Sequence, residues 1–346
     1  AVQHSGRAVE LLVDAGFAAD SLSVPGTARL AMDMLDEGTE RRTALEISEE
    51  KAMLGAILGT GCSLDACSVS LNALRQNLDA SLDLFADVVL NPAFSEEDFR
   101  LLQKQHLAGI KQEKSSPGGM AMRVFPQLLY GQKHAYGVPF SGLGMEADVS
   151  RLAPADLRRF HQTWFKPNNA TLVVVGDITL SEVTPKLERL FEGWRSGEIP
   201  HKNVATVGSQ EKPLVYVVDR PGSIQSMIVV GNLAPPRAGS NDEAIGMMNK
   251  LLGGDFTSRI NMNLREDKHW SYGARTSIGS ARGQRLFWAS VAVQGDKTKE
   301  TMTELNNELH GIVGTRPVTD AEFTRVVTNQ TLKMPGSWET QDSVAG

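Results

Sequence analysis

The chain has 346 residues, which is enough for two domains with separate hydrophobic cores. Its content of 41% hydrophobic and 22% charged residues is that of an ordinary globular protein. The net charge of −6, without a basic block, argues against nucleic acid as the main partner. No apolar run approaches the ~18–20 residues of a membrane span, and no targeting segment is recognised.

The sequence predicts both strands and helices in each half of the chain. In the first half, apolar runs predict strands at 9–15, 62–71 and 168–176. Amphipathic patterns and caps predict helices there at 27–35, 44–58, 76–90, 96–113, 120–130, 154–164 and 181–194. In the second half, strands are expected at 213–218, 224–231, 272–278 and 286–293, and helices at 241–252 and 297–313.

The two halves repeat the same order of elements. Residues 91–99 match residues 316–323, because in both a proline loop and a Ser or Thr cap open a helix. The spacing of such matches, about 220 residues, indicates a duplication of whole domains. We therefore predict a first domain at 1–195 and a second at 212–346, joined by a linker near 195–212, with the second copy truncated at its C-terminus.

Cys62 and Cys67 are the only cysteines. They lie five positions apart in a predicted strand, where an odd separation points side chains to opposite faces. We therefore expect two buried thiols rather than a disulfide or a two-thiolate metal site.

Five segments, taken in this order, resemble the insulinase/pitrilysin family of zinc peptidases over nearly the whole chain. They are 26–39, which begins Gly-Thr-Ala-Arg and ends Gly-Thr, 42–47 (Arg-Thr-Ala-Leu-Glu-Ile), 164–169 (Trp-Phe-Lys-Pro-Asn-Asn), 173–177 (Val-Val-Val-Gly-Asp) and 264–273. The resemblance implies the α+β class. It implies two tandem homologous α/β domains, each a sheet with helices packed on one side.

The zinc-binding positions implied by this resemblance are all replaced. The family helix reads G-x-A-H-x-x-E-H; here Arg29 stands for the first histidine, Met32 for the glutamate and Asp33 for the second histidine. Gly109 stands at the place of the distal glutamate ligand. We therefore predict no metal or other cofactor in this chain and expect zinc in a partner.

The purely structural interpretation is that Arg29 and Asp33, four residues apart on a helix, form an ion pair and that Met32 packs in the hydrophobic core. The alternative is that Arg29 or Asp33 contributes to a partner interface. Both interpretations stay open at this point.

Arg265 and Tyr272 resemble a family pair that faces the zinc from the second domain, and the spacing of seven residues is kept. A tyrosine hydroxyl can donate a hydrogen bond to the oxyanion that forms during peptide hydrolysis, and an arginine can hold the substrate backbone. The opposing interpretation is that Arg265 pairs with Glu266 or Asp267 and that Tyr272 is half-buried.

The resemblance implies a catalytically incomplete subunit or half of a zinc metallopeptidase. In this hypothesis a zinc-bearing homologous partner cleaves unfolded or short peptides, while Arg265 and Tyr272 support substrate and transition state in a heterodimer. Alternatives are a structural or assembly subunit, like the respiratory-complex core proteins that this family also resembles, and a peptide-binding module without a catalytic partner. Because bacterial relatives of this type are often exported, a periplasmic location is expected.

Overall fold

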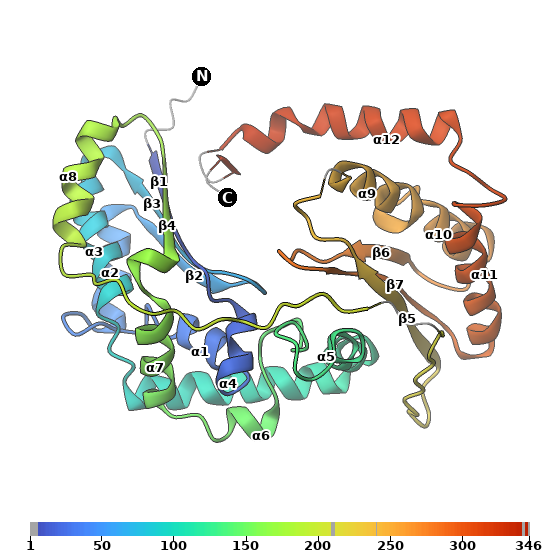
Figure 1. Ribbon diagram of the computed structural model, residues 1–346, viewed down its shortest axis with the longest axis horizontal. Coiled ribbons are helices and arrows are strands. Elements are labelled where there is room, and N and C mark those ends of the chain that lie inside the picture. The colour runs from blue at the N-terminus through green and yellow to red at the C-terminus, as the bar shows by residue number, and fades with distance from the viewer. Residues whose placement is uncertain (1–5, 209–211, 240, 341–342, 345–346) are drawn as a thin grey trace. The chain divides into compact units, whose positions relative to one another are not determined.

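A computed structural model describes residues 6–208, 212–239, 241–340 and 343–344 (Figure 1). The chain divides into two compact units. The first contains the chain up to Glu113, then Gly131–Asn203 and the segment from Pro335 onward. The second contains Lys114–Tyr130 and Val204–Met334. The mixture of helices and sheets in two units confirms the predicted α+β class.

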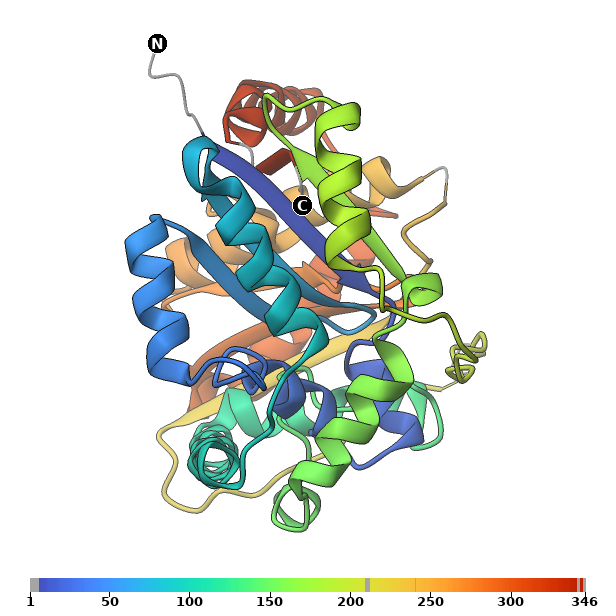
Figure 2. The ribbon, with the colours of Figure 1, turned by 90° about the vertical axis from the view of Figure 1, so that its left-hand side faces the viewer.

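The first unit is built on a four-stranded sheet of order β2-β3-β1-β4, with all neighbours antiparallel. The strands are β1 (Gly6–Val13), β2 (Ile57–Cys62), β3 (Cys67–Leu74) and β4 (Ala170–Val175). The helices are α1 (Thr27–Asp33), α2 (Ala44–Leu54), α3 (Leu78–Leu90), α4 (Glu96–Ser115), α6 (Glu146–Val149), α7 (Pro154–Trp164) and α8 (Leu180–Leu190). Helices α3 and α8 lie on the same face of this sheet (Figures 1 and 2).

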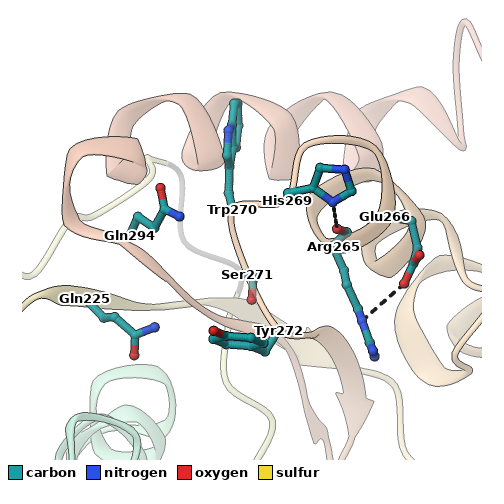
Figure 3. A pocket seen from close by; sticks show the side chains of 8 residues that line it. All are labelled: Gln225, Arg265, Glu266, His269, Trp270, Ser271, Tyr272 and Gln294. Atoms are coloured by element: carbon teal, nitrogen blue, oxygen red, sulfur yellow. Dashed lines mark hydrogen bonds and ion pairs between the residues drawn. The ribbon is translucent and has the colours of Figure 1, made fainter.

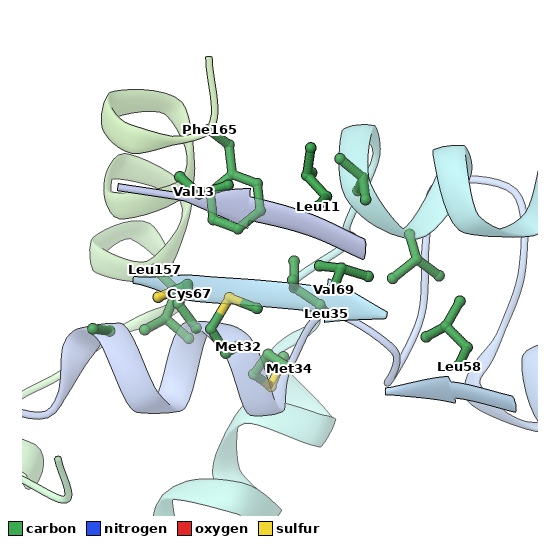
Figure 4. Packing of buried hydrophobic residues seen from close by; sticks show 14 of the residues in the cluster. Leu11, Val13, Met32, Met34, Leu35, Leu58, Cys67, Val69, Leu157 and Phe165 are labelled. Carbon is green, nitrogen blue, oxygen red and sulfur yellow. The ribbon is translucent and has the colours of Figure 1, made fainter. Parts of the chain in front are cut away.

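The core of the first unit follows from two periodicities. Alternate residues Val9, Leu11 and Val13 of β1 are buried because successive side chains of a strand point to opposite faces. Met32 of helix α1 and Met34, the residue that caps the end of α1, pack under the sheet (Figure 4). Met32 is completely buried, so the prediction that it fills the core is confirmed.

The second unit has a three-stranded antiparallel sheet of order β5-β7-β6. Its strands are β5 (Gln225–Ala234), β6 (Ala274–Ile278) and β7 (Arg285–Gln294). Its helices are α5 (Pro117–Tyr130), α9 (Asp242–Asn249), α10 (Arg259–Asn261), α11 (Thr298–Gly311) and α12 (Asp320–Lys333). Helix α5 packs closely on β5, where a Cβ added to Gly231 would lie 2.7 Å from Phe125 Cζ.

The sheets of the two units share one topology, which agrees with the predicted duplication. In each, the third strand along the unit lies between the first and the second: β3 between β1 and β2, and β7 between β5 and β6. The predicted caps are also present. The hydroxyl of Ser95 accepts a hydrogen bond from the backbone of Asp98 at the start of α4, and that of Thr319 accepts one from Glu322 at the start of α12.

The prediction for the two cysteines is wrong, because Cys62 and Cys67 form a disulfide. The prediction assumed that both cysteines lie in one continuous strand. Residues 62–71 are not one strand, because β2 ends at Cys62 and β3 begins at Cys67. The two residues face each other across this hairpin, with their Cα atoms 4.0 Å apart.

Two other predicted elements also differ from the structure. The helix expected at 44–58 ends at Leu54, because Gly55 takes the left-handed conformation, with φ 61°, that ends helices. The strand expected at 213–218 is not formed; the segment is not paired with any strand in the described ranges. Among the described helices, none is long and apolar enough to cross a membrane.

The disulfide leads to a prediction about stability. Replacing both Cys62 and Cys67 by alanine is expected to lower the free energy of unfolding by about 2 kcal/mol, since the bond constrains a short loop of the unfolded chain. Urea denaturation with and without dithiothreitol measures the effect. The reductant should destabilise the wild type and leave the variant unchanged; a wild type insensitive to dithiothreitol would contradict the bond.

Candidate functional site

Helix α1 carries the three residues that replace the family's zinc-site residues, namely Arg29, Met32 and Asp33. Arg29 Nε lies 3.0 Å from Asp33 Oδ2, so the predicted ion pair is present. Met32, between them, points into the core. Gly109 lies on α4, where an added Cβ would be 3.1 Å from Leu143 Cδ1.

A histidine that the sequence analysis did not select completes this arrangement. His106 lies one turn before Gly109 on α4, and its Nε2 is 2.8 Å from Asp33 Oδ2. Its side chain is only 5% exposed. Burial alone would raise the pKa of Asp33, but the hydrogen bond from His106 and the charge of Arg29 outweigh it, so the pKa is lowered.

Arg29 and His106 therefore both contact the same carboxylate oxygen of Asp33, Oδ2. Among the residues that the structure describes, no group of three or more His, Cys, Asp or Glu side chains is arranged to hold a metal ion. A peptidase zinc site needs three protein ligands and an open position. The described residues at α1 and α4 do not fit that requirement.

The start of α1 depends on a second carboxylate, that of Asp20, which is buried. Asp20 accepts hydrogen bonds from the backbone N–H groups of Gly26 (2.7 Å) and Ala28 (2.9 Å), because N–H groups at a helix N-terminus have no partner within the helix. Gly26 has φ 100°, a left-handed conformation that favours glycine. Burial raises the pKa of Asp20 to about 7, although the two backbone donors act in the opposite direction.

This shift predicts a pH dependence of stability. The folded state keeps the Asp20 proton up to a pKa of about 7, whereas the ordinary value is 3.8. The contribution is therefore fully present below about pH 4 and is lost as the pH rises to 7. Asp20→Asn cannot ionise, so its stability should lack this decrease. Thermal unfolding of both proteins between pH 5 and 8 tests it; parallel curves would contradict the assignment.

The loop after α1 is fixed by a third carboxylate, which sequence analysis also missed. Asp87 of α3 is fully buried and accepts hydrogen bonds from Thr39 (2.7 Å), Arg41 (2.8 Å), Arg42 (2.7 Å) and Asn91 (2.9 Å). Thr39 and Arg42, which each belong to one of the motifs of the sequence analysis, are thus held by one carboxylate. Burial would raise the pKa of Asp87, but these bonds lower it below the ordinary value.

In the second unit, Arg265 and Tyr272 line one pocket of about 370 Å³. The other lining residues are Gln225, Glu266, His269, Trp270, Ser271 and Gln294. Figure 3 shows Tyr272 between Gln225 and Arg265, with Trp270 pointing away from Tyr272. The structure thus brings the two sequence-predicted residues together, and most of the lining comes from the segment 265–272 that contains them.

The local backbone positions this pair. Residues Met262–Asp267 form a π-helical turn, a feature that is often found at functional sites. His269 then takes φ 58°, and its Nδ1 lies 3.0 Å from the carbonyl oxygen of Arg265. After this turn at His269, the edge strand β6 begins directly behind Tyr272 and Gly273.

The side chains of the pair differ in their surroundings. Arg265 Nε lies 3.2 Å from Glu266 Oε1, and its guanidinium carbon lies 4.7 Å from the ring centre of Phe256. Tyr272 is 92% exposed, so the expectation that it is half-buried is wrong. An exposed phenol can donate a hydrogen bond to a bound molecule, and an arginine can hold a carbonyl or carboxylate with its fork of donors.

Two duplicated sheet-and-helix units, in which Arg29, Met32 and Asp33 replace the residues of the family's zinc-binding helix, define a peptidase-like protein of inactive type. Comparisons with known proteins support this class. A family model described as "Insulinase (Peptidase family M16)" matches residues 3–128. A second, described as "Peptidase M16 inactive domain", matches residues 151–330. The chain therefore belongs to the insulinase family, peptidase family M16, which confirms the resemblance.

Individual relatives are distant but cover most of the chain. An uncharacterized zinc protease of Mycobacterium leprae is 23% identical, over 91% of this chain and 70% of that protein. The zinc protease PqqE of Helicobacter pylori is 22% identical, over 98% of this chain and 76% of its own length.

Solved structures share the fold. A peptidase M16 inactive domain from Pseudomonas fluorescens has a TM-score of 0.87 at 22% identity, covering 99% of this chain and 81% of that one. A protease from Helicobacter pylori has a TM-score of 0.90 at 21% identity, with coverage of 99% and 83%.

Proposed function

We propose that this chain is the zinc-free subunit of a two-part metallopeptidase and supplies Arg265 and Tyr272 to a homologous partner that carries the zinc. The observation that carries the proposal is the exposed Tyr272 beside Arg265 in one pocket. A phenol that serves only the fold is expected to bury most of its ring, because the ring is largely apolar. The Tyr272 hydroxyl instead remains free to reach a bound peptide.

The proposed substrate is an unfolded or short peptide in extended form. Strand β2 forms one edge of the first sheet and β6 one edge of the second. An extended peptide can add to such an edge through main-chain hydrogen bonds, which do not depend on its side chains. Selection by sequence would then be loose. Arg265 would hold the peptide backbone, and Tyr272 would donate to the carbonyl oxygen that becomes negatively charged.

The disulfide between Cys62 and Cys67 supports a location in an oxidising compartment, and a periplasmic site is part of this proposal.

The competing proposal is an assembly subunit without a catalytic role. It is favoured by the ion pair of Arg265 with Glu266 and by the contact of Arg265 with Phe256, which give the arginine partners within its own unit. In that case the partner's activity would be indifferent to Arg265 and Tyr272.

Reconstitution separates the two proposals. The purified chain alone is expected to contain no stoichiometric zinc and to cleave no peptide. Mixed with a homologous subunit that carries an intact H-x-x-E-H helix, it should raise peptide hydrolysis well above that of either protein alone. Metal analysis of the separate proteins identifies which one holds zinc. One zinc per isolated chain would refute the proposal, and so would a complex whose activity equals that of the partner alone.

A further inference from the structure

The backbone on either side of Tyr272 fixes its place. The ring of Tyr272 is 92% exposed, so packing contributes little to holding it. The hydroxyl of Ser271 closes a turn around Tyr272, because it accepts a hydrogen bond from the N–H of Gly273 (3.1 Å) and donates one to the Gly273 carbonyl oxygen (2.9 Å). Directly after this turn, the N–H of Ala274 donates to Oδ1 of Asn261 (3.1 Å). The position of Tyr272 therefore depends on Asn261.

Arg265 depends on the same asparagine through Phe256. The guanidinium carbon of Arg265 lies 4.7 Å from the centre of the Phe256 ring, a distance at which an aromatic ring attracts a cation. Asn261 is the last residue of α10, and its Nδ2 donates a hydrogen bond of 2.7 Å to the carbonyl oxygen of Phe256. Asn261 therefore holds the residue against which the Arg265 guanidinium rests.

Asn261 thus holds both supports with one side chain. It is only 4% exposed, and both ends of its amide have a partner. Only one orientation of the amide satisfies them, since the Phe256 carbonyl oxygen can only accept and the Ala274 N–H can only donate. Breaking these bonds would leave the buried amide without partners, which is costly. The amide of Asn261 therefore fixes the separation between the two backbone segments.

We propose that Asn261 is a positioning residue that sets the separation of Arg265 and Tyr272. It acts through Phe256 on the arginine and through Ala274 on the tyrosine, and it does not itself touch the substrate. This inference rests on the proposed function, because the separation matters for hydrolysis only if the pair takes part in it. A misplacement of about 1 Å in such a group lowers the rate about 100-fold.

The first measurement uses the chain alone and does not depend on the proposed function. Asn261→Ala removes both hydrogen bonds, so amide hydrogen exchange in residues 271–275, followed by mass spectrometry, should become at least about tenfold faster. The control is Asn169→Ala in the first unit, which also removes an amide that donates to two carbonyl oxygens, those of Asp14 (3.2 Å) and Trp164 (2.9 Å). It should leave exchange in 271–275 unchanged. Unchanged exchange in Asn261→Ala would refute the inference.

The second measurement is a double-mutant cycle in the complex with a zinc-bearing partner and an unstructured fluorogenic peptide. Asn261→Ala is expected to lower kcat/KM about 100-fold. Tyr272→Phe should then lower kcat less than about threefold in the Asn261→Ala background, because the hydroxyl has already lost its position. Asn169→Ala should leave both kcat and KM unchanged.

A more conservative variant separates the two bonds. Asn261→Asp keeps the size of the side chain and an acceptor for the Ala274 N–H, but once ionised it no longer donates to Phe256. At pH 8 we therefore expect KM to rise about tenfold, with kcat changed less than about threefold. An unchanged KM would contradict the link between Asn261 and Arg265, and it can be measured even if Asn261→Ala does not fold.

The outcomes distinguish this inference from the proposed function. If Tyr272→Phe lowers kcat by the same factor with and without Asn261→Ala, the two losses are independent and Asn261 does not position the pair. If Tyr272→Phe has no effect in the otherwise unchanged chain, the proposed function is refuted, and the catalytic consequence of Asn261 is refuted with it.

Discussion

Tyr272→Phe, tested in the complex with a zinc-bearing partner, is expected to lower kcat for peptide hydrolysis about 100-fold or more. The substitution removes one hydroxyl and keeps the ring, so the loss would isolate the proposed hydrogen bond to the developing oxyanion. Removal of one such donor costs 10²–10³ in kcat in well-studied enzymes. Because Tyr272 is 92% exposed, the loss of its hydroxyl should leave the free energy of unfolding of this chain unchanged.

A matched control is available in the same chain. Tyr216 is also exposed, at 59%, and lies outside the pocket. Tyr216→Phe should therefore leave kcat unchanged. Arg265→Ala should act mainly on KM if the arginine holds the substrate equally in the ground and transition states. Equal activity of the wild type and an Arg265→Ala, Tyr272→Phe double variant would favour the assembly subunit over the catalytic one.

Asp87→Ala is expected to have the largest effect on stability, a loss of about 3–5 kcal/mol in the free energy of unfolding. Asp87 is fully buried, and its removal leaves the buried hydroxyl of Thr39 without its acceptor and takes from Arg42 one of the three carboxylates that it contacts. Urea denaturation monitored by circular dichroism measures the change.

Asp83 provides the control for this substitution. It contacts the same two arginines, Arg41 and Arg42, but its side chain is 42% exposed. Asp83→Ala should therefore cost at most about 1 kcal/mol. The lowered pKa of Asp87 adds a pH signature, since its contribution is present near neutral pH and is lost as the pH falls through its folded pKa. Equal losses in the two variants would contradict the role assigned to burial.

The sequence by itself determined the class of the fold, the family and the replacement of the family's histidines and glutamate on α1. These depend on local patterns. A period of two predicted the buried face of β1, a period of 3.6 predicted the amphipathic helices, and the cap residues Ser95 and Thr319 predicted where α4 and α12 begin. The ion pair between Arg29 and Asp33 is local too, because positions four apart on a helix are neighbours.

Only the tertiary structure decided which distant groups meet. The pairing of Cys62 with Cys67 needs the hairpin between β2 and β3, and the contact of His106 with Asp33 needs α4 to pack against α1. The four hydrogen bonds to Asp87 join α3 to a loop that lies more than 40 positions earlier and to its own C-terminal turn. The exposure of Tyr272 is also a tertiary property. Sequence periodicity reports which side of an element a residue occupies, whereas the groups that cover that side come from other parts of the chain.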